Sequence, residues 1–143
     1  AELQVPYILM HSRGDASNMQ SLCDYKDVTE EVCLELSESL LKLRNKGVRD
    51  VIIDPGFGFA KNTEQNYELF KNLSLLKILE CPILIGISRK SMIYRMLNTN
   101  PSEALNGTSV LNTAGLLKDA SILRVHDVKE AKEVAQIVKM LKK

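Results

Sequence analysis

The stretch Asp54-Pro55-Gly56-Phe57-Gly58-Phe59-Ala60-Lys61 directly follows the apolar run Val51-Ile52-Ile53. A short apolar run rich in β-branched residues is typical of a strand covered on both faces, as in a parallel sheet. Apolar residues then recur at helical spacing, at Tyr67, Phe70, Leu73, Leu76 and Leu79. A strand, a glycine-containing loop and an amphipathic helix in this order predict one unit of an α/β fold.

The same order of strand and helix recurs three more times. Further apolar runs are found at Val5–Met10, Pro82–Ile87 and Ser121–Val125. Helical spacing follows each run, in stripes that begin at Val28, Leu105 and Ala131, and a short extra helix is expected over Ser91–Leu97. We therefore predict an α/β fold of four consecutive βα units with a parallel sheet, in a single domain that spans residues 1–143.

The helix termini carry a common short pattern. An N-capping side chain stands three residues before a carboxylate or amide in four pairs: Asp27 with Glu30, Asn62 with Gln65, Asn100 with Glu103, and Asp127 with Glu130. Each pair resembles a capping box. Pro101 occupies the favoured first helical position, and Gly47 is a C-cap candidate for the first long helix.

The composition is that of a globular protein, with 143 residues, 45% hydrophobic and 26% charged. Nineteen basic and 18 acidic residues leave a net charge of +1, which does not suggest a nucleic acid or an anionic membrane as partner. No apolar run approaches the roughly 20 residues that span a bilayer. The two histidines lie on distant strands without metal-ligand spacing, so no metal site is expected within this chain.

The start of the chain and the cysteines suggest where the protein works. Residues 1–4 lack the basic region of a signal peptide. Cys23, Cys33 and Cys81 include no CxxC pair, so we expect reduced thiols and a cytoplasmic protein. Because the chain begins with Ala1 and reaches an apolar segment almost at once, we also expect it to be a piece of a longer protein.

Polar residues gather where each predicted strand ends. The four ends read His11-Ser12-Arg13-Gly14, Asp54-Pro55-Gly56, Gly86-Ile87-Ser88-Arg89-Lys90 and Arg124-Val125-His126-Asp127. Ligands of α/β folds bind at the carboxyl ends of parallel strands. Alternation along the strands places Asp54, Ser88, Lys90, Arg124 and His126 on a common face, and we expect them to converge on one pocket.

The residue types indicate what such a pocket binds. The carboxylate of Asp54 suits the hydrogen-bond donors of an amino-heterocycle. The cationic set of Lys90, Arg124 and His126 suits a phosphate or pyrophosphate. Glycines in the loops would let a planar ligand approach the backbone closely.

Most of these residues also have an ordinary structural interpretation. In this interpretation Asp54 opens a turn, Lys90 is a solvated residue of the short helix, and Ser88 caps that helix. His11 would be a strand-end histidine with its hydrogen bonds satisfied, and Asp127 only the N-cap of the last helix. Arg124 is harder to explain in this way, because an inward-facing cation needs a partner. A hydrolase triad of Ser88, His126 and Asp54 is not supported, because the Gly-x-Ser-x-Gly elbow is absent.

Three of these segments resemble signature segments of the dihydropteroate synthase family, in the family's order and approximate spacing. They are Asp54–Lys61, Gly86–Lys90 and Arg124–Val128, and Leu9–Gly14 resembles a fourth. The resemblance covers the whole chain but only the C-terminal half of the family's TIM (β/α)8 barrel, which implies βα units 5 to 8. Ser88-Arg89-Lys90 favours the synthases over the related pterin-binding methyltransferases.

The resemblance implies a role for each matching residue. The implied pterin-binding residues are Asp54, Lys90, Arg124, Met10, Leu84, Gly86 and Phe59. Phe59 and Ser88 would lie near the p-aminobenzoate site, where sulfonamide analogues also bind. Arg124 and His126 would hold the leaving pyrophosphate and, with Lys90, form the catalytic set.

The implied reaction condenses p-aminobenzoate with 6-hydroxymethyl-7,8-dihydropterin pyrophosphate to give 7,8-dihydropteroate and pyrophosphate, a step of folate biosynthesis. It would use Mg²⁺, whose protein ligand would lie in the N-terminal half. A full barrel has roughly 250 residues, so this chain alone is expected to be inactive. Free sheet edges and an uncovered apolar face predict a homodimer or association with the missing half. The alternatives are a pterin-binding methyltransferase relative and a non-catalytic half-barrel module.

Overall fold

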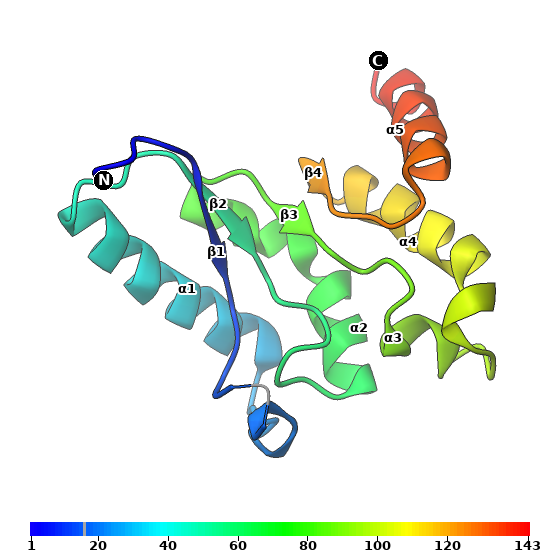
Figure 1. Cartoon of the computed structure of the whole chain (residues 1–143), viewed down its shortest axis with the longest axis horizontal. Helices are drawn as coiled ribbons and strands as arrows, with labels where there is room; N and C mark the ends of the chain where they lie inside the picture. The colour runs from blue at the N-terminus through cyan, green and yellow to red at the C-terminus, as the bar shows by residue number, and fades with distance from the viewer. Residues whose placement is uncertain (16) are drawn as a thin grey trace.

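Each strand of the computed structural model, which describes residues 1–15 and 17–143, overlaps a predicted run, but β3 and β4 are shorter than their runs (Figure 1). They are β1 (Tyr7–Met10), β2 (Val51–Asp54), β3 (Leu84–Ile85) and β4 (Ile122–Leu123). β1 pairs with β2 and β3 pairs with β4, both in parallel. A parallel bridge between Ile53 and Ile83 joins the two pairs, and the Ile53 amide donates to the carbonyl of Pro82 at 2.9 Å. The described strands thus form one parallel series, β1-β2-β3-β4, as the sequence predicts.

Helices connect the strands in the expected order. They are α1 (Val28–Asn45), α2 (Thr63–Lys71), α3 (Ser91–Tyr94), α4 (Leu105–Leu117) and α5 (Val128–Leu141), with 3₁₀ turns η1 (Met19–Ser21), η2 (Leu73–Leu79) and η3 (Pro101–Glu103). The single apolar stripe that starts at Tyr67 is divided at Asn72 into α2 and η2. α3 is shorter than the predicted Ser91–Leu97. Among the described residues, no helix combines the length and apolarity needed to cross a membrane.

The capping predictions are partly right. Asn62 forms the full capping box with Gln65 at the start of α2, and Asp27 accepts from the Glu30 amide at the start of α1. Gly47 follows the end of α1 in the left-handed conformation, with φ 83°. The other two boxes are wrong. Asn100 accepts from the Ser102 amide in the short turn η3, and the Asp127 side chain makes no cap.

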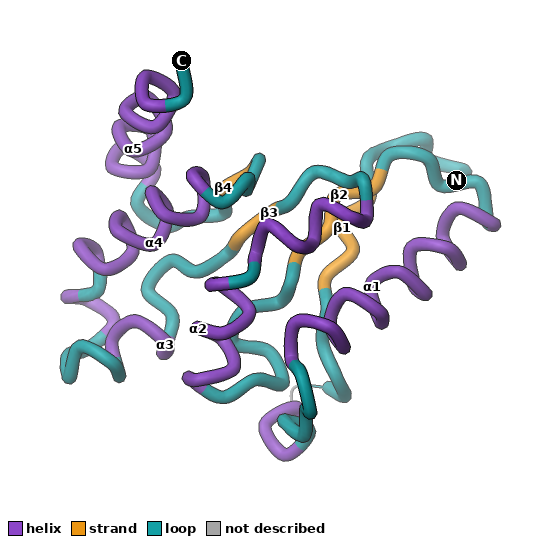
Figure 2. The backbone as a smooth tube through the Cα atoms, turned by 180° about the vertical axis from the view of Figure 1, so that it is seen from behind, coloured by secondary structure: helices purple, strands orange, loops and turns teal. Residues whose placement is uncertain are grey.

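The two faces of the sheet differ sharply. Ile53, Ile83 and Ile85 face the helices and are fully buried, in a core shared with α1, α2 and η2. Figure 2 shows this helical layer in front of the strands, whereas Figure 1 looks onto the face without helices. On that face Ile8 is 52% exposed and Met10 40% exposed. The sheet therefore has its core on the helical side. The opposite face, which we call the inner face, is apolar and exposed at β1, whereas Leu84 of β3 is buried there.

Candidate active site

The strand ends form a hollow at the carboxyl edge of β3 and β4. Its volume is about 290 Å³, and its lining consists of Gly86, Ser88, Arg89, Lys90, Arg124, Val125 and His126. Asp54 lies at the end of β2, and its β1 neighbour in the ladder is Met10. The predicted residues of the second, third and fourth strands are thus brought to one edge of the sheet.

Asp54 is both a turn residue and a buried charge. Its Oδ1 accepts the Gly56 amide at 2.8 Å, so the turn interpretation is correct. The side chain is also buried, and burial raises the pKa of the Asp54 carboxyl, although the Gly56 hydrogen bond and the charges of Lys90, Lys61 and Arg124 oppose this rise. A desolvated carboxylate among three cations is poised to bind a hydrogen-bond donor.

Lys90 reaches from the start of α3 back to the loop after β2. Its ammonium donates to the carbonyl of Phe57 and lies 4.7 Å from the centre of the Phe59 ring. Burial lowers the pKa of Lys90, against the attraction of Asp54. The interpretation of Lys90 as a solvated helix residue is therefore wrong, and the side chain links Phe59 to the hollow.

Ser88 and His126 meet across β3 and β4. The Ser88 hydroxyl lies 3.0 Å from His126 Nδ1 and accepts the His126 amide at 3.2 Å. Ser88 is therefore occupied in holding His126 and does not cap α3, whose N-cap position is Lys90. Within the described chain, no carboxylate is hydrogen-bonded to His126, so the pair does not form a hydrolase triad. Arg124 lies beside Gly86, where a Cβ would come within 3.8 Å of the arginine side chain.

Asp127 pairs with Arg89 instead of capping α5. The guanidinium donates to both carboxylate oxygens, at 2.9 and 2.8 Å, and also to the carbonyls of Pro101 and Ser102. A bidentate pair of this kind competes successfully with a single backbone N–H for the carboxylate. The pair ties the loop after β3 to the loop after β4, which carry Lys90 and His126.

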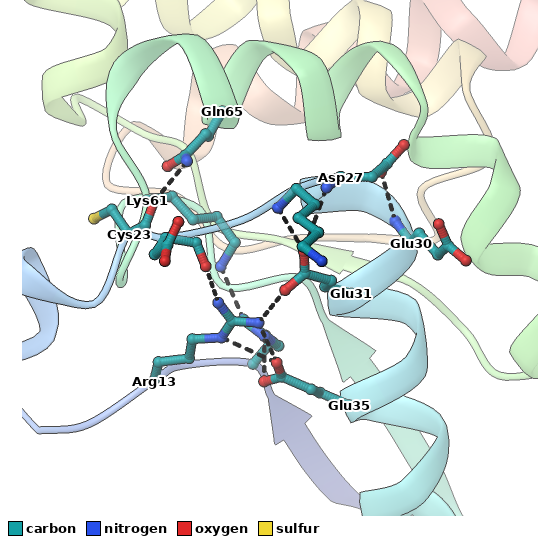
Figure 3. A network of polar contacts seen from close by, with 11 residues as sticks. Arg13, Cys23, Asp27, Glu30, Glu31, Glu35, Lys61 and Gln65 are labelled. Atoms are coloured by element: carbon teal, nitrogen blue, oxygen red, sulfur yellow. Dashed lines mark hydrogen bonds and ion pairs between the residues drawn. The ribbon is translucent and has the colours of Figure 1, made fainter.

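Behind the loop after β2 lies a polar network that the sequence does not predict (Figure 3). Lys61, His11, Glu35 and Arg13 form a continuous chain of hydrogen bonds and ion pairs from the loop to α1. His11 is buried and fully bonded, which agrees with its interpretation as a satisfied strand-end histidine. The one sequence feature that could have indicated this network is Lys61, the lysine at the end of the glycine-containing loop.

Metal ligands do not gather among residues 1–15 and 17–143, where no cluster of three His, Cys, Asp or Glu side chains could hold an ion. None of the roles proposed below depends on Mg²⁺.

A model of the pterin-binding enzyme family matches residues 1–126, which include Asp54, Lys90, Arg124 and His126. The chain belongs to this family. It is 39% identical to the dihydropteroate synthase of Escherichia coli over 140 residues, covering 96% of this chain and 50% of the relative. Identity to the dihydropteroate synthase of Clostridium beijerinckii is 39%, covering 99% and 51%. The chain thus spans about half the length of the curated relatives it matches.

Solved structures of this family share the fold of the whole chain. The Yersinia pestis dihydropteroate synthase in complex with a sulfonamide drug superposes with a TM-score of 0.96 at 35% identity, covering 99% of this chain and 53% of that one. The Thermus thermophilus synthase in complex with 4-aminobenzoate gives 0.95 at 30% identity, covering 99% and 59%. The predicted fold class, four βα units that make half of a TIM barrel, is confirmed.

Proposed function

We propose that this chain is the C-terminal half, βα units 5 to 8, of a dihydropteroate synthase, with residues 1–143 forming one partial pterin-binding domain. The observation that carries the proposal is the gathering of a buried carboxylate, Asp54, with Lys90, Arg124 and His126 at the carboxyl edge of one parallel sheet. These groups match the charge pattern of a dihydropterin pyrophosphate, which has donors on its ring and negative charge on its tail.

Each side chain then has a distinct task. Asp54 accepts the N–H groups of the pterin, and Lys90 donates to its carbonyl and ring nitrogen. Arg124 and His126 stabilise the pyrophosphate as the bond between the methylene carbon and oxygen breaks. The electron-rich pterin supports the positive charge on the methylene, the amino group of p-aminobenzoate attacks it, and that nitrogen then releases a proton.

Phe59 and Ser88 are proposed to border the p-aminobenzoate and sulfonamide site, and Met10, Leu84 and Gly86 to shape the pterin slot. Phe59 lies against the Lys90 ammonium, so the proposed p-aminobenzoate site is next to the proposed pterin site. Ser88 contributes through His126, because its hydroxyl is already bonded to that residue. Mg²⁺ is assigned to the other half of the enzyme, and the cytoplasm is the proposed location.

The test is the binding of a pterin analogue, pteroic acid, with and without Lys90. We expect Lys90→Ala to weaken binding about tenfold, because a charge-assisted hydrogen bond contributes about 1.5–3 kcal/mol and water replaces part of it. Lys129→Ala, which removes an exposed lysine from α5, should leave binding unchanged. Isothermal titration calorimetry measures both constants. Equal affinity of wild type and Lys90→Ala would refute the assigned role, and no affinity at all when the other half is supplied would favour the non-catalytic module.

The uncovered inner face predicts association. We propose that it is covered by the other half of the barrel or, in its absence, by a second copy of the chain. Ile137, Met140 and Leu141 of α5 are also exposed and form a separate apolar surface for a homodimer. On size-exclusion chromatography with light scattering, the chain should have an average mass above its 16.0 kDa.

A pair of single substitutions distinguishes the inner face from the helical layer. Ile8→Glu, on the inner face, should lower the average mass, because a carboxylate there opposes burial. Ile78→Glu, on η2, should not, although Ile78 is 77% exposed. A stable 16.0 kDa monomer of the wild-type chain would contradict the proposal.

A further inference from the structure

The ammonium of Lys61 lies against the backbone of the loop Asp54–Lys61, and only 3% of the residue is exposed. It donates to the carbonyls of Gly56, at 3.2 Å, and Phe59, at 3.0 Å, and its third contact is His11 Nδ1 at 2.9 Å. An ammonium has three N–H donors and no acceptor. All three donors of Lys61 are therefore used, two of them on the backbone of this loop.

This arrangement fixes the proton on the His11 ring. Because Nδ1 accepts from Lys61, the proton of the neutral ring is on Nε2, which donates to Glu35 at 3.1 Å. Burial and the charge of Lys61 lower the pKa of His11 to about 4, so the ring is neutral at neutral pH. Burial also lowers the pKa of Lys61, to about 7, against the charges of Asp54 and Glu35.

The far end of the network is anchored on α1. Arg13 donates to Glu35 at 2.9 Å and to Glu31 at 2.7 Å, and its guanidinium lies 3.8 Å from the centre of the Tyr25 ring. Figure 3 shows Arg13 between these two carboxylates, with Lys61 above them. The loop carbonyls are thus connected through a chain of hydrogen-bonded side chains to the long helix α1.

The other side of the same loop faces the proposed ligand site. Phe57 accepts from Lys90, and the ring of Phe59 lies against the Lys90 ammonium. Two lysines therefore hold one short loop: the buried Lys61 bonds the carbonyls of Gly56 and Phe59, and Lys90, which lines the hollow, bonds that of Phe57. A shift of the Phe59 carbonyl would move both its ring and its contact with Lys90.

We infer that Lys61 is a positioning residue that, held by His11 and Glu35, fixes the Gly56 and Phe59 carbonyls and so sets the place of the Phe59 ring against Lys90. The effect on ligands rests on the proposed function; the arrangement of the loop does not. Lys61 touches no reacting atom and acts only through this loop.

The first test needs no variant. Two-bond ¹⁵N–¹H correlation spectra of the wild-type chain, recorded about one pH unit below the pKa of Lys61 so that its ammonium is charged, report which ring nitrogen of His11 carries the proton. We expect the proton on Nε2. A proton on Nδ1 would overturn the inference, because Lys61 could not then donate to that atom.

The second test follows Phe59 by ¹⁹F NMR in protein labelled with fluorophenylalanine. Lys61→Met should shift and broaden the Phe59 resonance and leave that of the core residue Phe70 in place. Lys71→Met is the matched control at an exposed lysine and should change neither. Glu35→Ala, at a half-exposed site, should move the Phe59 resonance in the same direction by a smaller amount, even if Lys61→Met does not fold. An unmoved Phe59 in both variants would contradict the inference.

A kinetic test links the loop to the ligand site. In the full-length synthase, Lys61→Met should raise the KM for p-aminobenzoate on the order of tenfold more than the KM for the pterin substrate, because a small displacement of a positioning group is costly. Equal rises in both constants, with Phe59 undisturbed, would overturn the positioning role. A shifted Phe59 without any synthase activity in the wild type would instead refute the proposed function and leave the role of Lys61 in the loop intact.

Discussion

Asp54→Asn is expected to weaken the binding of pteroic acid on the order of 100-fold while leaving the fold at least as stable as the wild type. The asparagine oxygen can still accept the Gly56 amide, so the turn is kept. Its NH₂ group, however, meets the N–H donors of the pterin, which leaves donors unpaired in a desolvated site. Isothermal titration calorimetry measures the loss.

The pKa of Asp54 also predicts the direction in which Asp54→Asn changes the stability of the protein. The folded-state pKa of Asp54 is raised, so the folded protein binds more protons than the unfolded chain between the two pKa values. The charged carboxyl therefore destabilises the wild type as pH rises through this window. Thermal unfolding should show Asp54→Asn gaining stability at pH 7 and losing that advantage in acid.

Asp50→Asn is the matched control, because Asp50 is exposed just before the other end of β2. It should affect neither binding nor stability. If Asp54→Asn bound pteroic acid as well as the wild type, the carboxylate would be only a turn residue. If Asp50→Asn weakened binding equally, the loss would reflect net charge and not a hydrogen bond.

The sequence predicts the positions of the two central strands, β2 and β3, because burial decides them. Ile53, Ile83 and Ile85 have no exposed face, so an apolar run is sufficient evidence for each strand. The convergence of the polar strand ends follows from the topology, since parallel strands in adjacent βα units place their carboxyl ends at one edge. This is why Lys90 and His126 could be assigned to one hollow without coordinates.

The capping patterns show that a local sequence pattern does not always predict a helix cap. Asn62 and Asp127 stand in the same short pattern, yet only Asn62 caps its helix. The difference is Arg89, a partner 38 residues away along the chain that binds both oxygens of Asp127. Lys61 escapes prediction for the same reason, because its partner His11 is 50 residues away. Local sequence patterns do not show which side chains become partners when they are far apart along the chain.

The largest effect on stability is expected from Gly56→Ala. Gly56 has φ 68°, and a Cβ built there would lie 1.8 Å from the carbonyl oxygen of His11. The left-handed conformation alone costs about 1 kcal/mol for an alanine. The overlap is with backbone, so the end of β1 and the loop after β2 would have to separate, which disrupts the bonds of both Asp54 and Lys61 to this loop. We expect a total loss of about 4 kcal/mol or failure to fold.

Gly47→Ala separates the cost of the left-handed backbone conformation from the cost of steric overlap. Gly47 has φ 83°, and its Cβ would meet only the Ala1 side chain at 3.7 Å, an ordinary contact. Thermal unfolding should show a loss of about 1 kcal/mol for Gly47→Ala, from backbone conformation alone, and a several-fold larger loss for Gly56→Ala. Equal losses would mean that conformation is the whole effect and that β1 and the loop can move apart freely. A larger loss at Gly56 instead shows that the proposed site depends on close contact between the backbones of the first two strand ends.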